Sequence, residues 1–232
     1  MTSLERLSAR ITACRLCPRL VAWREQVARE KRRAYKGEVY WGRPVPGFGD
    51  PAARLVVVGL APAAHGANRT GRMFTGDRSG DFLYAALHRA GLASQPHSTA
   101  RDDGQELRGV FITAPCRCAP PENRPTPDEL ATCRAWLIRE LGELHQATVF
   151  LALGKTGYDA IALLARARAD RSKVRPPPFA HGVLASIPHP GRAGEATLVG
   201  SYHVSQQNTQ TGRLTAPMFD RVLAEAARHA GL

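Results

Sequence analysis

Four short apolar runs, each bounded by turn-forming residues, predict the strands of this 232-residue chain. They occupy residues 54–60, 110–114, 148–153 and 197–202. Each run is short for a helix and rich in Val, Leu, Ile or Phe, which is typical of strands that are buried on both faces.

Apolar residues at helical spacing predict helices between and around these strands. In residues 4–35 the spacing is interrupted at Cys14 to Pro18, which indicates two short helices around a tight cysteine turn. Thr126-Pro127-Asp128-Glu129 has the N-cap, first-turn Pro and third-position Glu of a helix start. The predicted helices after the first strand span residues 81–90, 126–144, 156–168 and 216–230, and a basic, Pro-rich loop spans 171–179.

Strands that alternate with helices favour a parallel sheet covered on both faces. The pattern contains neither a linker nor an internal repeat. We therefore expect an α/β fold: a three-layer α-β-α sandwich with a central, mostly parallel four-stranded sheet, formed by residues 1–232 as a single domain.

Composition narrows the class of protein. Hydrophobic residues make up 44% of the chain, which argues against wholesale disorder. No apolar run approaches the roughly 20 residues that cross a bilayer, and the first residues lack the apolar stretch of a secretion signal. We expect a soluble, cytoplasmic protein with no membrane partner.

Net charge points to a polyanion. The chain has 32 Lys and Arg against 20 Asp and Glu, a net charge of +12, and only four of the basic residues are Lys. Arg binds phosphate oxygens bidentately, and each neutralised phosphate releases counterions. Nucleic-acid binding is favoured, and we expect a nucleoid-associated monomer. The alternative explanation of the charge is the codon bias of a GC-rich genome, which raises Arg and Ala together.

Ligands of open parallel sheets gather at the carboxyl ends of the strands. The loops that leave these ends span residues 61–80, 115–125 and 203–215, and they contain most of the unusual residues of the chain. We therefore place the candidate chemistry in these three loops.

Five cysteines without a secretion signal make a disulfide framework a poor interpretation. Cys14 and Cys17 form a Cys-x-x-Cys pair, and Cys118 and Cys133 bracket the start of the 126–144 helix. Four thiolates suit either tetrahedral zinc or an iron–sulfur cluster, and spacing does not choose between them. A thioredoxin-like redox pair belongs between a strand and a helix, which is not the context here. Cys116 is interpreted as a small buried residue.

Taken together, the loops resemble a known family. Residues 59–77, GLAPAAHGANRTGRMFTGD, are similar to the first motif of the type 5 (B-type) uracil-DNA glycosylases. Residues 118–124, CAPPENR, with Cys133 match the cluster loop of the iron–sulfur members of that superfamily. Residues 203–213, HVSQQNTQTGR, resemble its DNA-contacting loop. The resemblance extends from Cys14 to the last helix.

The resemblance implies a structural 4Fe-4S cluster on Cys14, Cys17, Cys118 and Cys133. It also implies hydrolysis of the bond between a flipped-out base and deoxyribose in double- or single-stranded DNA. The implied catalytic residues are Asp77, Asn123 and His203, with Asp77 steadying the sugar cation or orienting water and His203 donating to the departing base. The residues implied to bind uracil are Gly59, His65, Phe74, Asn123 and His203, and those implied to bind DNA are Arg69, Arg72, Ser205, Gln206, Asn208 and Arg213.

Two features refine the expected activity. Most members of the superfamily have a polar residue soon after the first glycine of the motif, whereas this chain has Leu60-Ala61, and Ala114 stands where other members have a uracil-reading Asn. A looser pocket predicts hypoxanthine and other deaminated bases as substrates besides uracil.

None of the three loops contains Lys, so we expect a monofunctional enzyme of base excision repair that leaves an abasic site. The alternative from another class is a non-catalytic DNA-binding module stapled by a metal or iron–sulfur centre. An electron carrier fits the dispersed cysteines and the positive charge poorly.

Overall fold

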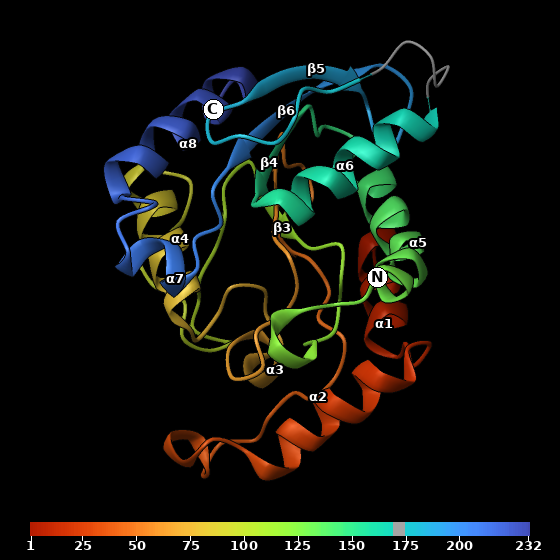
Figure 1. Ribbon diagram of the computed structural model, residues 1–232, viewed down its shortest axis with the longest axis vertical. Coiled ribbons are helices and arrows are strands. Elements are labelled where there is room, and N and C mark those ends of the chain that lie inside the picture. The colour runs from red at the N-terminus through yellow and green to blue at the C-terminus, as the bar shows by residue number, and fades with distance from the viewer. Residues whose placement is uncertain (169–174) are drawn as a thin grey trace.

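The computed structural model describes residues 1–168 and 175–232, and its centre is a single mixed sheet (Figure 1). The strand order is β1-β3-β2-β4-β6-β5. The four predicted strands are present as the parallel core β3, β2, β4 and β6. The strands span Phe48–Gly49 (β1), Leu55–Val58 (β2), Val110–Thr113 (β3), Val149–Leu153 (β4), Leu184–Pro188 (β5) and Glu195–Ser201 (β6).

The expected four-stranded sheet is thus corrected to six strands, because an antiparallel strand is added at each edge. β1 is two residues long and half-buried. β5 alternates exposed and buried residues and ends at Pro188. A strand buried on one face lacks a continuous apolar run, and an edge position tolerates Pro, so both strands gave a weak sequence signal.

Successive side chains of the core strands divide between two helical layers. Val57 and Leu151 pack with α4 (Arg78–Arg89) and α8 (Ala216–Ala230). Val56 and Phe150 pack with α5 (Pro127–Glu143) and α6 (Lys155–Arg168). This period of two explains why each strand is apolar throughout, and it confirms the three-layer α/β architecture.

Local signals place several helix ends. Thr126 accepts from the backbone of Glu129, whose carboxylate accepts from the backbone N–H of Thr126, so the predicted capping box is present. Residues 216–230 form α8, as predicted. The predicted 81–90 helix begins earlier, at Arg78, because Asp77 is its N-cap.

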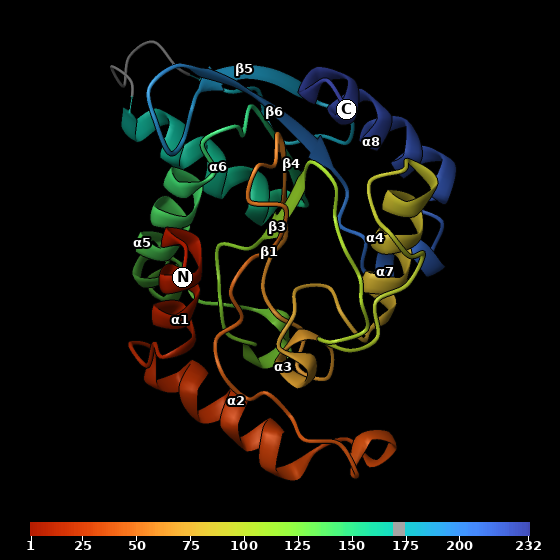
Figure 2. The same ribbon diagram turned by 180° about the vertical axis from the view of Figure 1, so that it is seen from behind.

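The amino-terminal segment lies beside this sandwich (Figure 2). It contains α1 (Ser3–Thr12), which packs against α5, and α2 (Pro18–Glu30), and the turn between the two helices contains Cys14 and Cys17. The shorter helices are η1 (Arg33–Tyr35), α3 (Ala67–Thr70), η2 (Pro121–Asn123) and α7 (Gln206–Gln210). These short elements were not separated from loops in the sequence.

Two further sequence expectations concern the basic, Pro-rich loop and the membrane. Residues 171–174 of the predicted 171–179 loop fall outside the described residues, and residues 175–179 form no helix or strand. Among the helices that the structure describes, none is both long and apolar enough to cross a membrane.

Candidate active site

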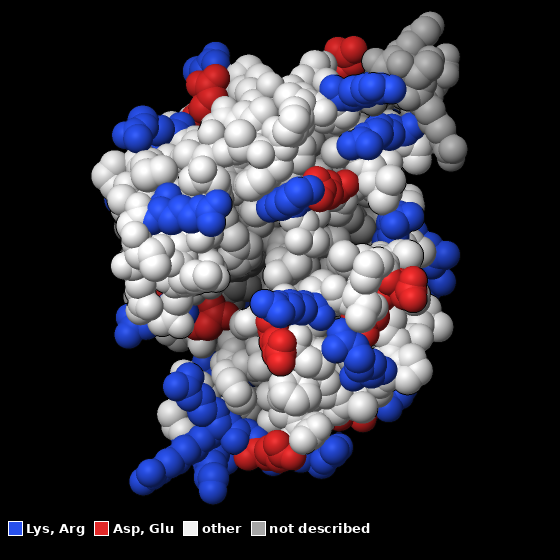
Figure 3. All heavy atoms as spheres, viewed as in Figure 1, with Lys and Arg blue, Asp and Glu red and all other residues white. Residues whose placement is uncertain are grey.

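The three strand-end loops meet around a pocket of about 620 Å³. Loop 61–80 follows β2, the loop with η2 follows β3, and α7 follows β6 (Figure 1). Figure 3 shows a hollow in this region of the molecular surface. Phe74, Asp77, Asn123 and His203 all line the pocket, so four of the predicted site residues are brought together from three separate segments.

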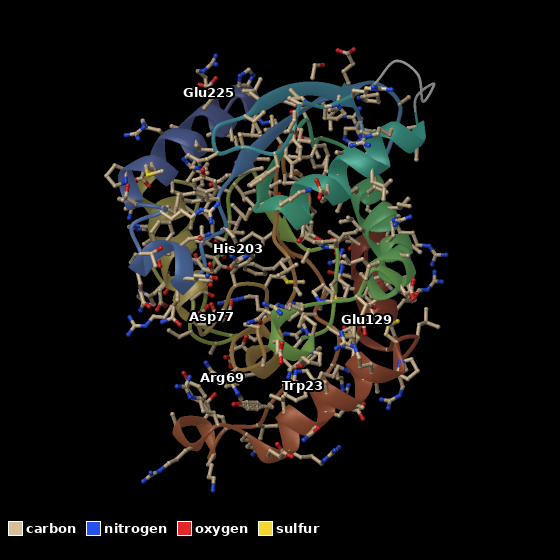
Figure 4. The ribbon with its side chains drawn as sticks, viewed as in Figure 1. Trp23, Arg69, Asp77, Glu129, His203 and Glu225 are labelled. Atoms are coloured by element: carbon tan, nitrogen blue, oxygen red, sulfur yellow. The ribbon has the colours of Figure 1, made fainter. Side chains whose placement is uncertain are left out.

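His203 lies two residues after the end of β6, and its ring faces the pocket (Figure 4). Gly154 gives it room, since a Cβ at that position would lie 3.1 Å from the Cβ of His203. The side chain of Asn208 donates a 2.7 Å hydrogen bond to the carbonyl of His203 and so fixes the loop. Burial lowers the pKa of His203 to about 4. The imidazole is therefore neutral at neutral pH and keeps one N–H to donate.

Asp77 occupies two positions of interest at once, the N-cap of a helix and the wall of the pocket. Its Oδ1 accepts a 3.0 Å hydrogen bond from the backbone of Gly80 and caps α4. The carboxylate also lines the pocket. A Cβ on Gly66 would lie 1.9 Å from Oδ2, so the glycine is what lets the carboxylate occupy this position. Burial raises the pKa of Asp77, and hydrogen bonds from the backbone of Gly80 and Ser79 oppose that rise.

Phe74 adopts a left-handed backbone with φ of 52°, which is strained for a residue with a side chain. Its ring lies over Gly59, where a Cβ would approach the ring atoms to 2.8 Å. The ring centroid is 6.2 Å from that of His203. Gly59, predicted to bind uracil, is buried behind this ring and is not among the pocket-lining residues.

Asn123 ends η2 at the rim of the pocket and is exposed. Its φ of 56° is a left-handed conformation, which Asn tolerates better than most residues. In the described part of the chain its side chain has no hydrogen-bond partner. The amide is therefore available to a ligand in the pocket.

His65 is not part of this pocket. Its Nδ1 lies 3.0 Å from the hydroxyl of Tyr40, in the interface between loop 61–80 and the segment after α2. The structure thus places His65, predicted to bind uracil, against Tyr40 and outside the residues that line the pocket.

Arg69 and Arg72 are also corrected. Their exposed fractions are 8% and 4%, and both guanidinium groups are bound by acceptors of the protein. Arg69 pairs with Glu38 and donates to the carbonyls of His65 and Gly76. Arg72 donates to Thr75, Ser98, Asp103 and the carbonyl of Arg101. These arginines fix the loop from inside and do not present their charge to DNA.

Three of the four remaining predicted DNA contacts line the pocket, and Arg213 does not. Ser205 and Gln206 begin α7 and line the pocket with Asn208. Arg213 is exposed and stacks on Tyr202, with its Cζ 4.8 Å from the ring centroid. The sequence did not single out several further lining residues: Ala63, Ala67, Met73, Ser79, Glu122 and Gln207. The small or apolar members of this set gave no chemical signal in a polar loop.

The cysteines come together at a second place. Cys14, Cys17, Cys118 and Cys133 line one small cavity together with Arg24, Arg117 and Trp136. Nη1 of Arg24 donates to Sγ of Cys118 at 2.9 Å, and Nε1 of Trp136 donates to Sγ of Cys14 at 3.4 Å. Cys116 is fully buried, does not line this cavity, and has its Sγ 3.3 Å from the carbonyl of Cys118. Within the described residues, no three His, Cys, Asp or Glu side chains converge on a position for one metal ion.

Comparison with known proteins agrees with the arrangement of the pocket. Residues 46–227 match the model of the uracil DNA glycosylase superfamily. The chain belongs to this superfamily. It is 57% identical to a type-5 uracil-DNA glycosylase of Thermus thermophilus over 96% of both chains. It is 52% identical to that of Mycobacterium leprae over 99% of this chain and 97% of the relative, and 45% identical to that of Pyrobaculum aerophilum over 96% and 91%.

The chain belongs to the type-5 branch of the superfamily, and the aligned regions include the segments that carry the candidate site residues. The matched region contains all three strand-end loops, and it begins after the Cys14-x-x-Cys17 turn. The type-5 relatives align with nearly the whole chain, which includes that turn. The resemblance inferred from the loop motifs is therefore confirmed at the level of the family.

Proposed function

We propose that this chain is a monofunctional uracil-DNA glycosylase, which hydrolyses the N-glycosidic bond of a flipped-out base and leaves an abasic site for base excision repair. The observation that carries the proposal is the convergence of Phe74, Asp77, Asn123 and His203 on one pocket from three separate loops. A DNA-binding module without activity would need no carboxylate and neutral imidazole in the lining of one pocket.

Each pocket residue has a role that follows from its position. The exposed face of the Phe74 ring offers a stacking surface to the base, and Asn123 offers an amide to its edge. As the bond between base and sugar breaks, negative charge grows on the base and positive charge on the sugar. The N–H of neutral His203 can stabilise the first by hydrogen bonding, and ionised Asp77 can stabilise the second or orient the attacking water.

The lining also supports a broad substrate range. Leu60, Ala61 and Ala63 contribute no side-chain donor or acceptor, so this wall of the pocket imposes no side-chain hydrogen bond on the base. We propose that hypoxanthine and other deaminated bases are accepted besides uracil. No described residue that lines the pocket is a lysine, which favours hydrolysis over a Schiff-base lyase step.

Single-turnover release of uracil from duplex and single-stranded oligonucleotides tests the activity. We expect Asp77→Ala and His203→Ala each to slow release by roughly 100- to 1000-fold while binding to an abasic product changes much less. Asp77→Asn separates catalysis from capping, because Asn caps a helix nearly as well but has no charge. An Asn variant with normal turnover would remove Asp77 from the mechanism, and a wild-type protein that binds uracil-DNA without releasing uracil would favour the non-catalytic module.

We further propose that Cys14, Cys17, Cys118 and Cys133 hold a structural 4Fe-4S cluster. The residues present fit such a group: four thiols line one cavity, and N–H donors from Arg24 and Trp136 reach two of the sulfurs. Nε of Arg24 is buried without a partner in the described residues, which leaves it free to face a sulfide. A cluster differs from a single metal ion in that each thiolate binds its own iron atom. When bound, it would tie the α1–α2 turn to the loop and helix that carry Cys118 and Cys133.

Metal analysis of the protein purified without air tests this assignment. We expect a brown protein with iron, and Cys118→Ala should lose iron and solubility together. Cys116→Ala is the matched control, because it removes a neighbouring buried thiol that does not line the cavity. Stoichiometric zinc without iron, or loss of iron in the Cys116 variant, would contradict the proposed ligand set.

A further inference from the structure

A dense group of cations projects from the end of α2. Between residues 29 and 43 the sequence contains six Lys and Arg but only two Glu. We call residues 31–36 the basic arm. Its side chains at Arg32, Arg33 and Lys36 are exposed, and Figure 3 shows blue side chains gathered at this lower end of the molecule. The pocket does not include this segment.

Folding does not account for these charges. In the described part of the chain, Arg32, Arg33 and Lys36 have no acidic partner within ion-pair distance. The nearby Glu38 is already paired with Arg69. Three like charges on one short turn repel each other, so a cluster of this kind is favourable chiefly when it meets an external polyanion.

The basic arm is fixed relative to the pocket by Arg69. The Cζ of Arg69 lies 4.0 Å from the centroid of the Tyr35 ring, inside the arm, and Nη1 binds Glu38 just beyond it. Nη2 of the same guanidinium donates a 2.8 Å hydrogen bond to the carbonyl of Gly76, the residue before Asp77. Figure 4 shows Arg69 between the arm and the loop that carries Asp77. One buried side chain thus connects the arm to the catalytic loop.

We propose that the basic arm binds the phosphate backbone of the DNA duplex beside the flipped-out nucleotide. The inference rests on the proposed function, and it adds a second contact surface outside the three strand-end loops. The rigid connection through Arg69 would set the position of a bound polyanion relative to the pocket. The polyanion that needs such a fixed position is duplex DNA. Arg32 and Arg33 can bind phosphate oxygens bidentately, and Lys36 adds a point charge.

The test compares two triple variants of the full chain. The arm variant is Arg32→Ala, Arg33→Ala and Lys36→Ala. The control is Arg108→Ala, Arg166→Ala and Arg168→Ala. These three exposed cations lie just before the start of β3 and at the end of α6, away from the carboxyl ends of the strands that carry the pocket loops. The probe is a duplex with an abasic-site analogue, and the measurement is the slope of the logarithm of the association constant against that of salt concentration.

We expect the arm variant to lower the magnitude of this slope by about 2 to 3, close to one unit per lost phosphate contact, and the control to leave it unchanged. Single-turnover release of uracil at saturating enzyme should stay the same. Replacing Arg32 and Arg33 by Lys should keep most of the slope. Shortening the duplex on the side that the arm covers should weaken binding by the wild type and leave binding by the arm variant unchanged.

Equal slopes for wild type and arm variant, or an equal loss in the control, would overturn the proposal. The proposed function fails separately, if the wild type releases no uracil. In that case a slope difference between the variants would still assign DNA to the arm.

Discussion

The base pocket and the region beneath the cysteine cavity are built in opposite ways. In the pocket, Asp77 and Phe74 are positioned by backbone shape, because Gly66 and Gly59 allow approaches that a Cβ would block. Beneath the cavity, Arg117 and Glu140 are positioned by side-chain bonds to each other, at 3.1 and 2.7 Å. The pocket leaves polar groups open to a ligand, whereas both carboxylate oxygens of Glu140 are bonded within the protein.

This contrast predicts that substitutions at the Arg117–Glu140 pair lower stability, whereas substitutions in the pocket lower the rate of the reaction. Glu140 also accepts from the hydroxyl of Thr113 and from the backbone N–H of Gly47, so one carboxylate links α5, β3 and the segment before β1. A charge removed there should cost stability. In the pocket, adding a single methyl group should cost rate. The predictions below test this division.

The largest effect is expected from Arg117→Ala. Arg117 and Glu140 are 1% and 0% exposed, so the substitution leaves a carboxylate buried without its counter-charge. We expect a loss of about 3–5 kcal/mol in the free energy of unfolding, measured by urea titration. Arg89→Ala is the matched control, because the Arg89–Asp220 pair is half-exposed and such pairs contribute about 0–1 kcal/mol. Similar losses of unfolding free energy in both variants would contradict the view that the buried Arg117–Glu140 pair contributes more stability than an exposed pair.

Gly66→Ala should act on rate instead. The new Cβ would lie 1.9 Å from Oδ2 of Asp77, so the carboxylate must move, and a displacement of about 1 Å can cost roughly 100-fold in the chemical step. Single-turnover uracil release measures the effect. Gly142→Ala is the control, since its nearest neighbouring atom would be 3.8 Å away. A Gly66→Ala enzyme with wild-type release would show that the position of this carboxylate does not matter.

The same contrast explains what the sequence could predict. The parallel core strands and the meeting of the three strand-end loops were predictable, because apolar runs mark strands and their carboxyl ends converge. Within these loops, the resemblance to a known family singled out Asp77, Asn123 and His203. Arg69 and Arg72 were interpreted wrongly, since an arginine in a polar loop looks the same in sequence whether its partners are phosphates or carbonyls. The close approaches at Gly59 and Gly66 depend on tertiary contacts that no local pattern contains.

The pH dependence tests the charge of the pocket. Burial raises the pKa of Asp77, so the ionised form that can stabilise the sugar cation is lost sooner on acidification than for an exposed Asp. Uracil release by the wild type should fall about tenfold per pH unit below that pKa, with full rate above it. His203, whose pKa is about 4, stays neutral over most of this range. Asp77→Asn should be slow throughout and lack this acidic limb; an unchanged limb would assign it to another group.

The smallest effect is expected from Asn208→Ala. Asn208 was predicted to bind DNA, yet its Nδ2 donates to the carbonyl of His203 at 2.7 Å, and that bond holds the loop in which the imidazole sits. Its loss should cost about 1 kcal/mol, or roughly fivefold in single-turnover release, because one neutral hydrogen bond contributes about that much. Asn208→Asp should be no better, since a carboxylate cannot donate to a carbonyl. Gln207→Ala removes a neighbouring exposed residue of the pocket rim and should leave the rate unchanged. The affinity for an abasic duplex decides between the two roles: a positioning residue changes the rate and leaves affinity intact, whereas a DNA contact weakens affinity and leaves the rate at saturation intact.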